Sequence, residues 1–156
     1  MRMKSSAVAF GLATLLCAFM VGCEAIGASE EDPQQNLRPG SYAFTAYDLT
    51  GTAIIEGTLS LSFPRESRWD IEGTWEFRRQ AGDVSPRLKA RMTGQGQLHG
   101  TIQEGGNVRI SLHPEIEDAD SVLRGDFEDG DLFQGEWAIT DWGTDTAGGH
   151  FVAKPE

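Results

Sequence analysis

The sequence is poor in basic residues and in cysteine. Lysine and arginine together number 13, against 24 aspartates and glutamates, which gives a formal net charge of -11. Because binding to nucleic acid draws most of its free energy from basic side chains, this balance excludes nucleic acid as the expected partner. The two cysteines, Cys17 and Cys23, both lie near the start of the chain, so no disulfide framework is expected in the remainder.

A sustained helical period is also missing after the N-terminal segment, which argues against helical and α/β folds. The chain has 156 residues, a length typical of one domain.

The N-terminal segment has the pattern of an export signal. Arg2 and Lys4 precede an uncharged stretch, residues 7–21, that is too short to span a bilayer comfortably. Met20-Val21-Gly22-Cys23 resembles the bacterial lipobox, in which the cysteine is diacylated and becomes the new N-terminus. The resemblance implies a signal peptide over residues 1–22 and a lipid on Cys23 that anchors the protein to the membrane of the bacterial cell envelope, on the periplasmic or surface side. An ordinary cleaved signal and an uncleaved N-terminal anchor are the alternatives.

Residues 23–39 are predicted to be the lipidated N-terminus and a disordered tether. The segment is acidic, and Ile26 and Leu37 are its two large aliphatic residues, too few to order it by burial. A flexible chain of this length would place the following domain roughly 20–25 Å from the lipid.

From Gly40 to Glu156, apolar and polar residues alternate with a period of two, the pattern of strands with one buried and one solvated face. We predict eight strands, over Ser41–Tyr47, Thr52–Phe63, Arg68–Arg78, Ala90–Gln103, Asn107–His113, Ser121–Glu128, Asp131–Thr140 and Thr146–Lys154.

Short turns rich in glycine, aspartate and asparagine separate most of these strands, so successive strands should be antiparallel neighbours. The fold expected for residues 40–156 is therefore all-β, an eight-stranded antiparallel up-and-down barrel. A two-sheet sandwich is the alternative. Its crossing connections would have to be residues 79–89 and 114–120.

One local pattern repeats along the strands: a glycine, any residue, and then a large apolar residue on the same face. Inward glycine lets a strand coil sharply, and the neighbouring ring covers the gap. The pattern occurs at Gly57-Thr58-Leu59, Gly73-Thr74-Trp75, Gly100-Thr101-Ile102, Gly125-Asp126-Phe127, Gly135-Glu136-Trp137 and Gly149-His150-Phe151.

With the eight-stranded meander, these pairs resemble the calycin-like barrels, the lipocalins and avidins. Gly40-Ser41-Tyr42 is similar to the lipocalin Gly-x-Trp signature, with tyrosine in place of tryptophan. The resemblance implies a binding module whose ligand enters the mouth of the barrel.

The inward aromatic residues are the candidate ligand-binding site. They suit a small, largely apolar ligand, because pockets are mostly apolar with few polar groups. The alternative is that the rings fill the interior themselves, since an eight-stranded barrel is just wide enough for side chains. The candidates are Tyr42, Phe44, Trp69, Trp75, Phe127, Phe133, Trp137 and Phe151.

The charged and histidine residues predict neither catalysis nor a cofactor. A basic segment around residues 78–91 and an acidic one around 115–131 are most simply solvated surface, although the first could contact anionic lipid and the second could bind calcium. His99, His113 and His150 are too scattered for a zinc site, and no serine or cysteine nucleophile can be paired with them. We therefore expect a protein that is not an enzyme and holds no metal.

Two functions remain open at this point. The first is a membrane-tethered module that binds a small apolar molecule inside the barrel. The second is a structural or interaction lipoprotein, whose filled barrel contacts another envelope protein through its outer surface.

Overall fold

A computed structural model describes residues 37–80, 85–116, 118–129 and 131–156. The predicted signal peptide, Cys23 and most of the predicted tether lie outside the described residues.

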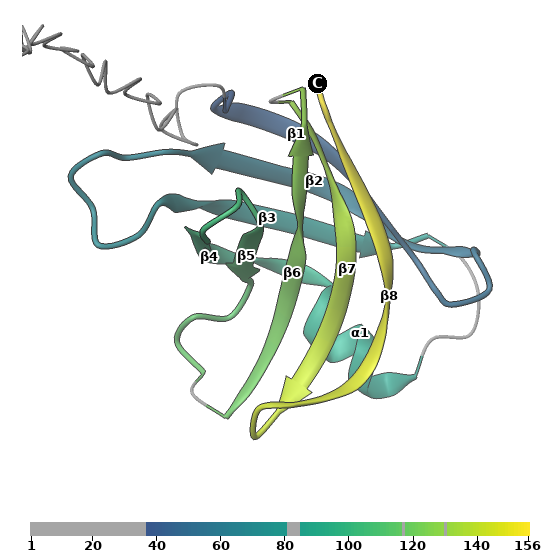
Figure 1. Cartoon of the computed structure of the whole chain (residues 1–156). Helices are drawn as coiled ribbons and strands as arrows, with labels where there is room; N and C mark the ends of the chain where they lie inside the picture. The colour runs from purple at the N-terminus through teal and green to yellow at the C-terminus, as the bar shows by residue number, and fades with distance from the viewer. Residues whose placement is uncertain (1–36, 81–84, 117, 130) are drawn as a thin grey trace, which may run out of the picture. The chain divides into compact units, whose positions relative to one another are not determined.

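Eight antiparallel strands close into one barrel (Figure 1). Each strand pairs with its neighbours in sequence, and β1 pairs with β8, so the sheet has no free edge. This confirms the predicted all-β, up-and-down barrel, which is compatible with a calycin-like fold, and it excludes the sandwich. The strands are β1 (Gly40–Tyr47), β2 (Ala53–Ser62), β3 (Ile71–Arg79), β4 (Gly94–Ile102), β5 (Val108–Ser111), β6 (Ala119–Glu128), β7 (Leu132–Asp141) and β8 (Thr144–Pro155).

The period-two pattern places the core inside the barrel. On β3, for example, Trp75 and Phe77 are buried, whereas Glu76 and Arg78 between and beyond them are exposed. The one predicted exception on β2, Ile54, is also buried. The register between β1 and β2 shifts there: Ala46 pairs with Ile55 and the next residue, Tyr47, pairs with Ala53. Ile54 is therefore the extra residue of a β-bulge, which explains why two consecutive isoleucines are both buried.

The β3–β4 connection contains a short helix, α1 (Pro86–Met92), that the sequence analysis missed. We predicted a strand from Ala90, but β4 begins at Gly94. The Ser85 side chain caps the helix by accepting a hydrogen bond from the Leu88 amide at 3.2 Å, and Pro86 follows the cap. The helix buries Leu88 and Met92, which lie one turn apart. A helix of seven residues is too short to produce a sustained helical period. The sequence analysis therefore did not predict it and began a strand within it.

The barrel has two ends with different connections. The tether end holds the start of β1, the C-terminus and the β2–β3, β4–β5 and β6–β7 connections. The helix end holds the β1–β2, β3–β4, β5–β6 and β7–β8 connections, and α1 lies there (Figure 1). Residues 37–39 therefore enter the barrel at the end opposite α1.

The inward glycines permit close approach of neighbouring strands. Gly125 and Gly135 are register partners on β6 and β7. A Cβ added to Gly135 would lie 2.0 Å from the Arg124 carbonyl oxygen and 2.5 Å from the Gly125 Cα. Backbone atoms cannot move aside as a flexible side chain can, so these strands depend on glycine.

We predict that Gly135→Ala destabilises the protein by about 1–3 kcal/mol, because the added methyl forces the strands apart. Urea unfolding monitored by tryptophan fluorescence measures the change. Thr74→Ala, at an exposed position of β3, is the control and should cost much less. Equal stability of Gly135→Ala and wild type would show that the strands do not need this close approach.

Candidate functional site

The barrel interior contains a continuous column of aromatic rings. Phe44 stacks on Phe77 with ring centroids 4.2 Å apart, and it also stacks on Phe151, with centroids 5.6 Å apart. Phe151 packs edge-on to Phe133 at 4.8 Å, and Phe133 stacks on Phe127 at 4.7 Å. The rings thus contact one another from the middle of the barrel to its tether end.

The two inward tryptophans extend this packing, and their indole N–H groups are satisfied. The ring centroids of Trp75 and Phe77 are 5.1 Å apart, and the Trp75 indole N–H donates a hydrogen bond to the Leu112 carbonyl at 2.8 Å. Trp137 donates to the Tyr47 carbonyl at 2.8 Å. Within the described residues, no buried side-chain nitrogen or oxygen lacks a hydrogen-bond partner. The interior therefore offers no vacant polar group to orient a guest.

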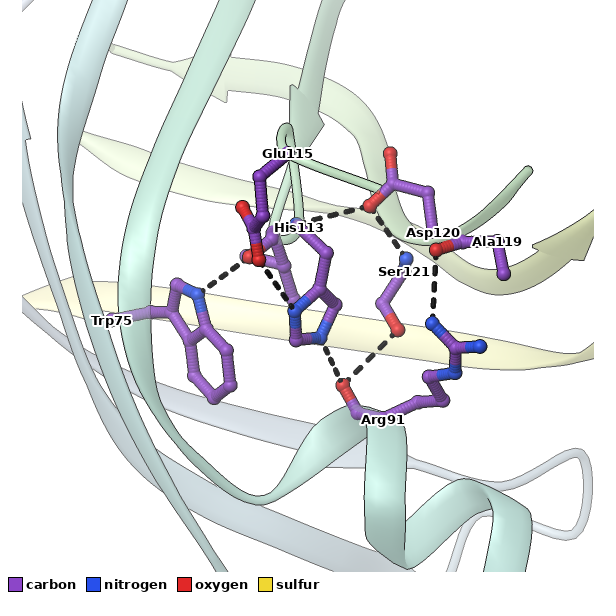
Figure 2. A network of polar contacts seen from close by, with 8 residues as sticks. Trp75, Arg91, His113, Glu115, Ala119, Asp120 and Ser121 are labelled. Carbon is purple, nitrogen blue, oxygen red and sulfur yellow. Dashed lines mark hydrogen bonds and ion pairs between the residues drawn. The ribbon is translucent and has the colours of Figure 1, made fainter. Parts of the chain in front are cut away.

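At the helix end, hydrogen bonds fasten α1 to the β5–β6 connection, as Figure 2 shows. The Arg91 carbonyl accepts hydrogen bonds from His113 Nε2 at 2.8 Å and from Ser121 Oγ at 3.1 Å. The Arg91 guanidinium donates to the Ala119 carbonyl at 2.9 Å. These contacts hold the buried face of α1 against the core, so the helix closes this end of the barrel.

A second layer of contacts positions His113. The Asp120 carboxylate accepts from the backbone amides of His113 at 3.1 Å and Ser121 at 2.7 Å. The Trp75 ring meets the His113 ring edge-on, with centroids 5.2 Å apart (Figure 2). Access from the helix end would require several of these bonds to break, each worth about 1 kcal/mol net.

The tether end is closed by Tyr42 with two partly buried rings, Phe63 and Phe127. Tyr42 is buried, and its hydroxyl donates a hydrogen bond to the Arg38 carbonyl. Burial raises the pKa of the Tyr42 phenol, the charge of Asp131 raises it further, and Arg38 partly offsets both effects. Both mouths of the barrel are thus covered by its own side chains.

Of the eight predicted site residues, seven meet in this core and one does not. Tyr42, Phe44, Trp75, Phe133, Trp137 and Phe151 are buried, and Phe127 is partly buried against them. Trp69 was predicted to point inward, and this was wrong. β3 begins two residues later, and Trp69 stacks on His99 of the outer wall, with centroids 5.1 Å apart.

The structure also shows where the histidines and the charged segments lie. His150 stacks on Tyr47 at 4.9 Å, and His113 belongs to the α1 network. The basic segment is partly helical, and Arg87 forms an ion pair with Asp141. Among residues 37–80, 85–116, 118–129 and 131–156, no three histidine, cysteine or acidic side chains gather as metal ligands would.

Several pockets around the described residues lie on the outer wall. Two adjacent grooves of about 520 and 410 Å³ run over β1–β4 and share Thr58 and Glu76, while a third, of about 360 Å³, lies beside Leu49 over β6–β8. The Arg124–Asp145 ion pair, at 2.9 Å, crosses β7 in this third groove; it lowers the pKa of Asp145 and raises that of Arg124.

Among the residues that the structure describes, the exposed large apolar side chains all lie on connections at the helix end. Leu49 is 88% exposed on the β1–β2 turn, Trp142 is 81% exposed on the β7–β8 turn, and Ile116 is 38% exposed on the β5–β6 connection. The Trp142 amide donates to the Asp118 carbonyl at 2.8 Å, which holds these last two segments together. We call these three residues the apolar rim.

The apolar rim rests on ordered turns. The Asp48 carboxylate accepts from the amides of Thr50 and Thr52 and from the Thr50 hydroxyl, at 2.7–2.9 Å, and these bonds lower the Asp48 pKa. Trp142 and Gly143 both have positive φ, of 49° and 75°, as a two-residue hairpin turn requires. The sequence analysis did not predict the rim. Trp142 before Gly143 was a usable signal, because asparagine, aspartate or glycine normally occupies the first position of such a hairpin turn.

We predict that the Tyr42 phenol ionises above about pH 10, the ordinary value for tyrosine. Because the folded state holds this proton more tightly, the stability contributed by the group is complete below about pH 10 and is lost as the pH rises through the folded pKa. The difference between the tyrosinate absorbance titrations of wild type and Tyr42→Phe isolates this group. A midpoint at or below the ordinary value would contradict the burial of Tyr42.

No helix among the described residues is both long enough and apolar enough to cross a membrane. Comparison of the chain with protein-family models, with curated proteins and with solved structures gives no match.

Proposed function

We propose that this protein is a bacterial envelope lipoprotein, held to its membrane by a lipid on Cys23, whose filled calycin-like barrel presents the apolar rim to another envelope protein. Its role is to bind a partner, without catalysis.

The occupied interior favours this function over storage of a small apolar molecule. A guest inside the barrel would have to displace rings such as Phe44 and Phe133, whose partners are one another. Each aromatic pair contributes about 0.5–1.5 kcal/mol beyond the burial of its surface. Several pairs would be broken together, and the closing contacts of α1 would be lost as well.

The conformation of Trp142 is the observation that carries the proposal. A bulky residue with positive φ is a genuine outlier, and the left-handed conformation costs about 1–2 kcal/mol for a residue other than glycine. The indole recovers little of this by packing, because Trp142 is 81% exposed. A residue with a strained backbone and a largely exposed side chain supports the hypothesis of an external contact.

The rest of the rim fits that interpretation. Leu49 and Ile116 lie on other turns of the same end, and the groove of about 360 Å³ begins beside Leu49. Exposed aromatic anchors surrounded by polar residues are typical of interface hot spots. A partner with an apolar pocket for the Trp142 indole would suit this surface.

The rim and the entry point of the chain lie at opposite ends of the barrel. Residues 37–39 lead into β1 at the tether end, and the rim lies at the helix end.

We predict that Trp142→Asn abolishes partner binding without destabilising the fold, since asparagine accepts positive φ far better than tryptophan. A photo-crosslinking residue replaces Thr144, which is exposed beside the rim, in the native host. It should yield one defined protein adduct, and that adduct should disappear when Trp142→Asn is added. Thermal unfolding should show a melting temperature equal to or above that of wild type.

Controls separate the parts of the proposal. A crosslinker at Gln97, exposed on the β4 wall, should give no such adduct, and Cys23→Ser should release the protein from the membrane fraction. An adduct at Thr144 that survives Trp142→Asn, or no adduct above the Gln97 background, would contradict the role of the rim. Unchanged membrane retention of Cys23→Ser would contradict the lipid anchor.

A further inference from the structure

A small pocket on the outer wall carries a charge opposite to that of the protein as a whole. It has a volume of about 270 Å³ and lies over β4 and β5, covered from one side by the β2–β3 connection. Its lining includes Arg68, Trp69, His99 and Arg109, and it contains no aspartate or glutamate. In a chain with 24 acidic residues and a net charge of -11, two arginines in one acid-free pocket are an unexpected arrangement.

The two arginines are available to a ligand. Among the described residues, neither Arg68 nor Arg109 forms an ion pair with a carboxylate; Arg109 influences Asp145 only through a longer-range charge interaction. Arg68 instead lies over the Trp69 ring, with its guanidinium carbon 4.5 Å from the centroid. His99 also stacks on Trp69, with ring centroids 5.1 Å apart, so this indole contacts both a guanidinium and an imidazole.

Hydrogen bonds within the protein hold the β2–β3 connection beside this pocket. The Ser67 hydroxyl accepts from the Trp69 amide at 3.1 Å and donates to the Glu72 carboxylate. The Asp70 carboxylate accepts from the Ile102 amide at 2.8 Å, which ties the start of β3 to the end of β4. Glu72 is the register partner of His99 but does not line the pocket.

The remaining polar groups of the pocket are hydrogen-bond donors. Thr101 and Ser111 contribute hydroxyls that no hydrogen bond engages within the described part of the chain, and the His99 ring contributes an N–H. Arginines with nearby hydroxyl and N–H donors match the oxygens of a tetrahedral oxyanion, because guanidinium binds such groups through paired hydrogen bonds. A volume of about 270 Å³ accommodates a phosphate with a small substituent, and it lies just below the range of drug-sized ligands.

We propose that this pocket binds a phosphate monoester group, clamped between Arg68 and Arg109 against the Trp69–His99 stack. The site is independent of the apolar rim, since it lies on the wall and shares no residue with it.

The test is a titration of the full chain, purified in detergent, at constant ionic strength and followed by the ¹H–¹⁵N resonance of the Trp69 indole. Trp69→Phe assigns that resonance by its disappearance. Inorganic phosphate, phenyl phosphate and phosphatidic acid dispersed in the same detergent are titrated separately. Saturable binding is expected, and the tightest of the three probes identifies the source of the group as a free ion, a small organic ester or a lipid.

Arg68→Gln and Arg109→Gln should each weaken binding about tenfold, as loss of a charged hydrogen-bond pair does. Arg65→Gln is the matched control. It removes the same charge from the same connection but does not line the pocket, so affinity should be unchanged. Absence of saturable binding with all three probes, or equal weakening by Arg65→Gln, would overturn the proposal. Neither outcome bears on the partner adduct at Thr144.

Discussion

The packing of aromatic rings inside the barrel is the constraint on which the rest of the structure depends. Four phenylalanine rings pack on one another by stacked and edge-on contacts: Phe44, Phe77, Phe133 and Phe151. The indole N–H groups of Trp75 and Trp137 each donate a hydrogen bond to a backbone carbonyl. Small barrels need a curved sheet around such a core, and inward glycines such as Gly135 supply the close strand approach that curvature requires. Leu88 and Met92 of α1 are buried in the same core cluster as these rings.

Because aromatic rings fill the interior, we propose that the protein functions through the outside of its barrel. Two outer features of the described residues support this proposal: the exposed apolar rim, which includes the strained Trp142, and the arginine pocket. The rim suits a protein partner and the pocket suits an oxyanion. Both use side chains that the core does not need, so either can change without loss of the barrel.

Period-two alternation was sufficient to predict the strands, their order and the closed barrel, because each strand has one buried face. It could not reveal α1, whose signal is limited to the Ser85-Pro86 cap and two buried residues. It misplaced Trp69, because the alternation starts before the residue at which β3 begins. It also left open whether the rings line a cavity or fill it. That depends on the register between strands, which decides that Phe44 faces Phe77 and Phe151, and register is a property of the closed sheet.

The occupied core is tested most directly by diffraction from crystals of the protein held under xenon, since apolar cavities bind this atom. The expected result is no xenon inside the wild-type barrel, with one site appearing in Phe44→Leu, where a smaller side chain opens space within the column. A xenon atom among Phe44, Phe133 and Phe151 of the wild type would contradict the filled interior and restore an apolar guest as the better hypothesis.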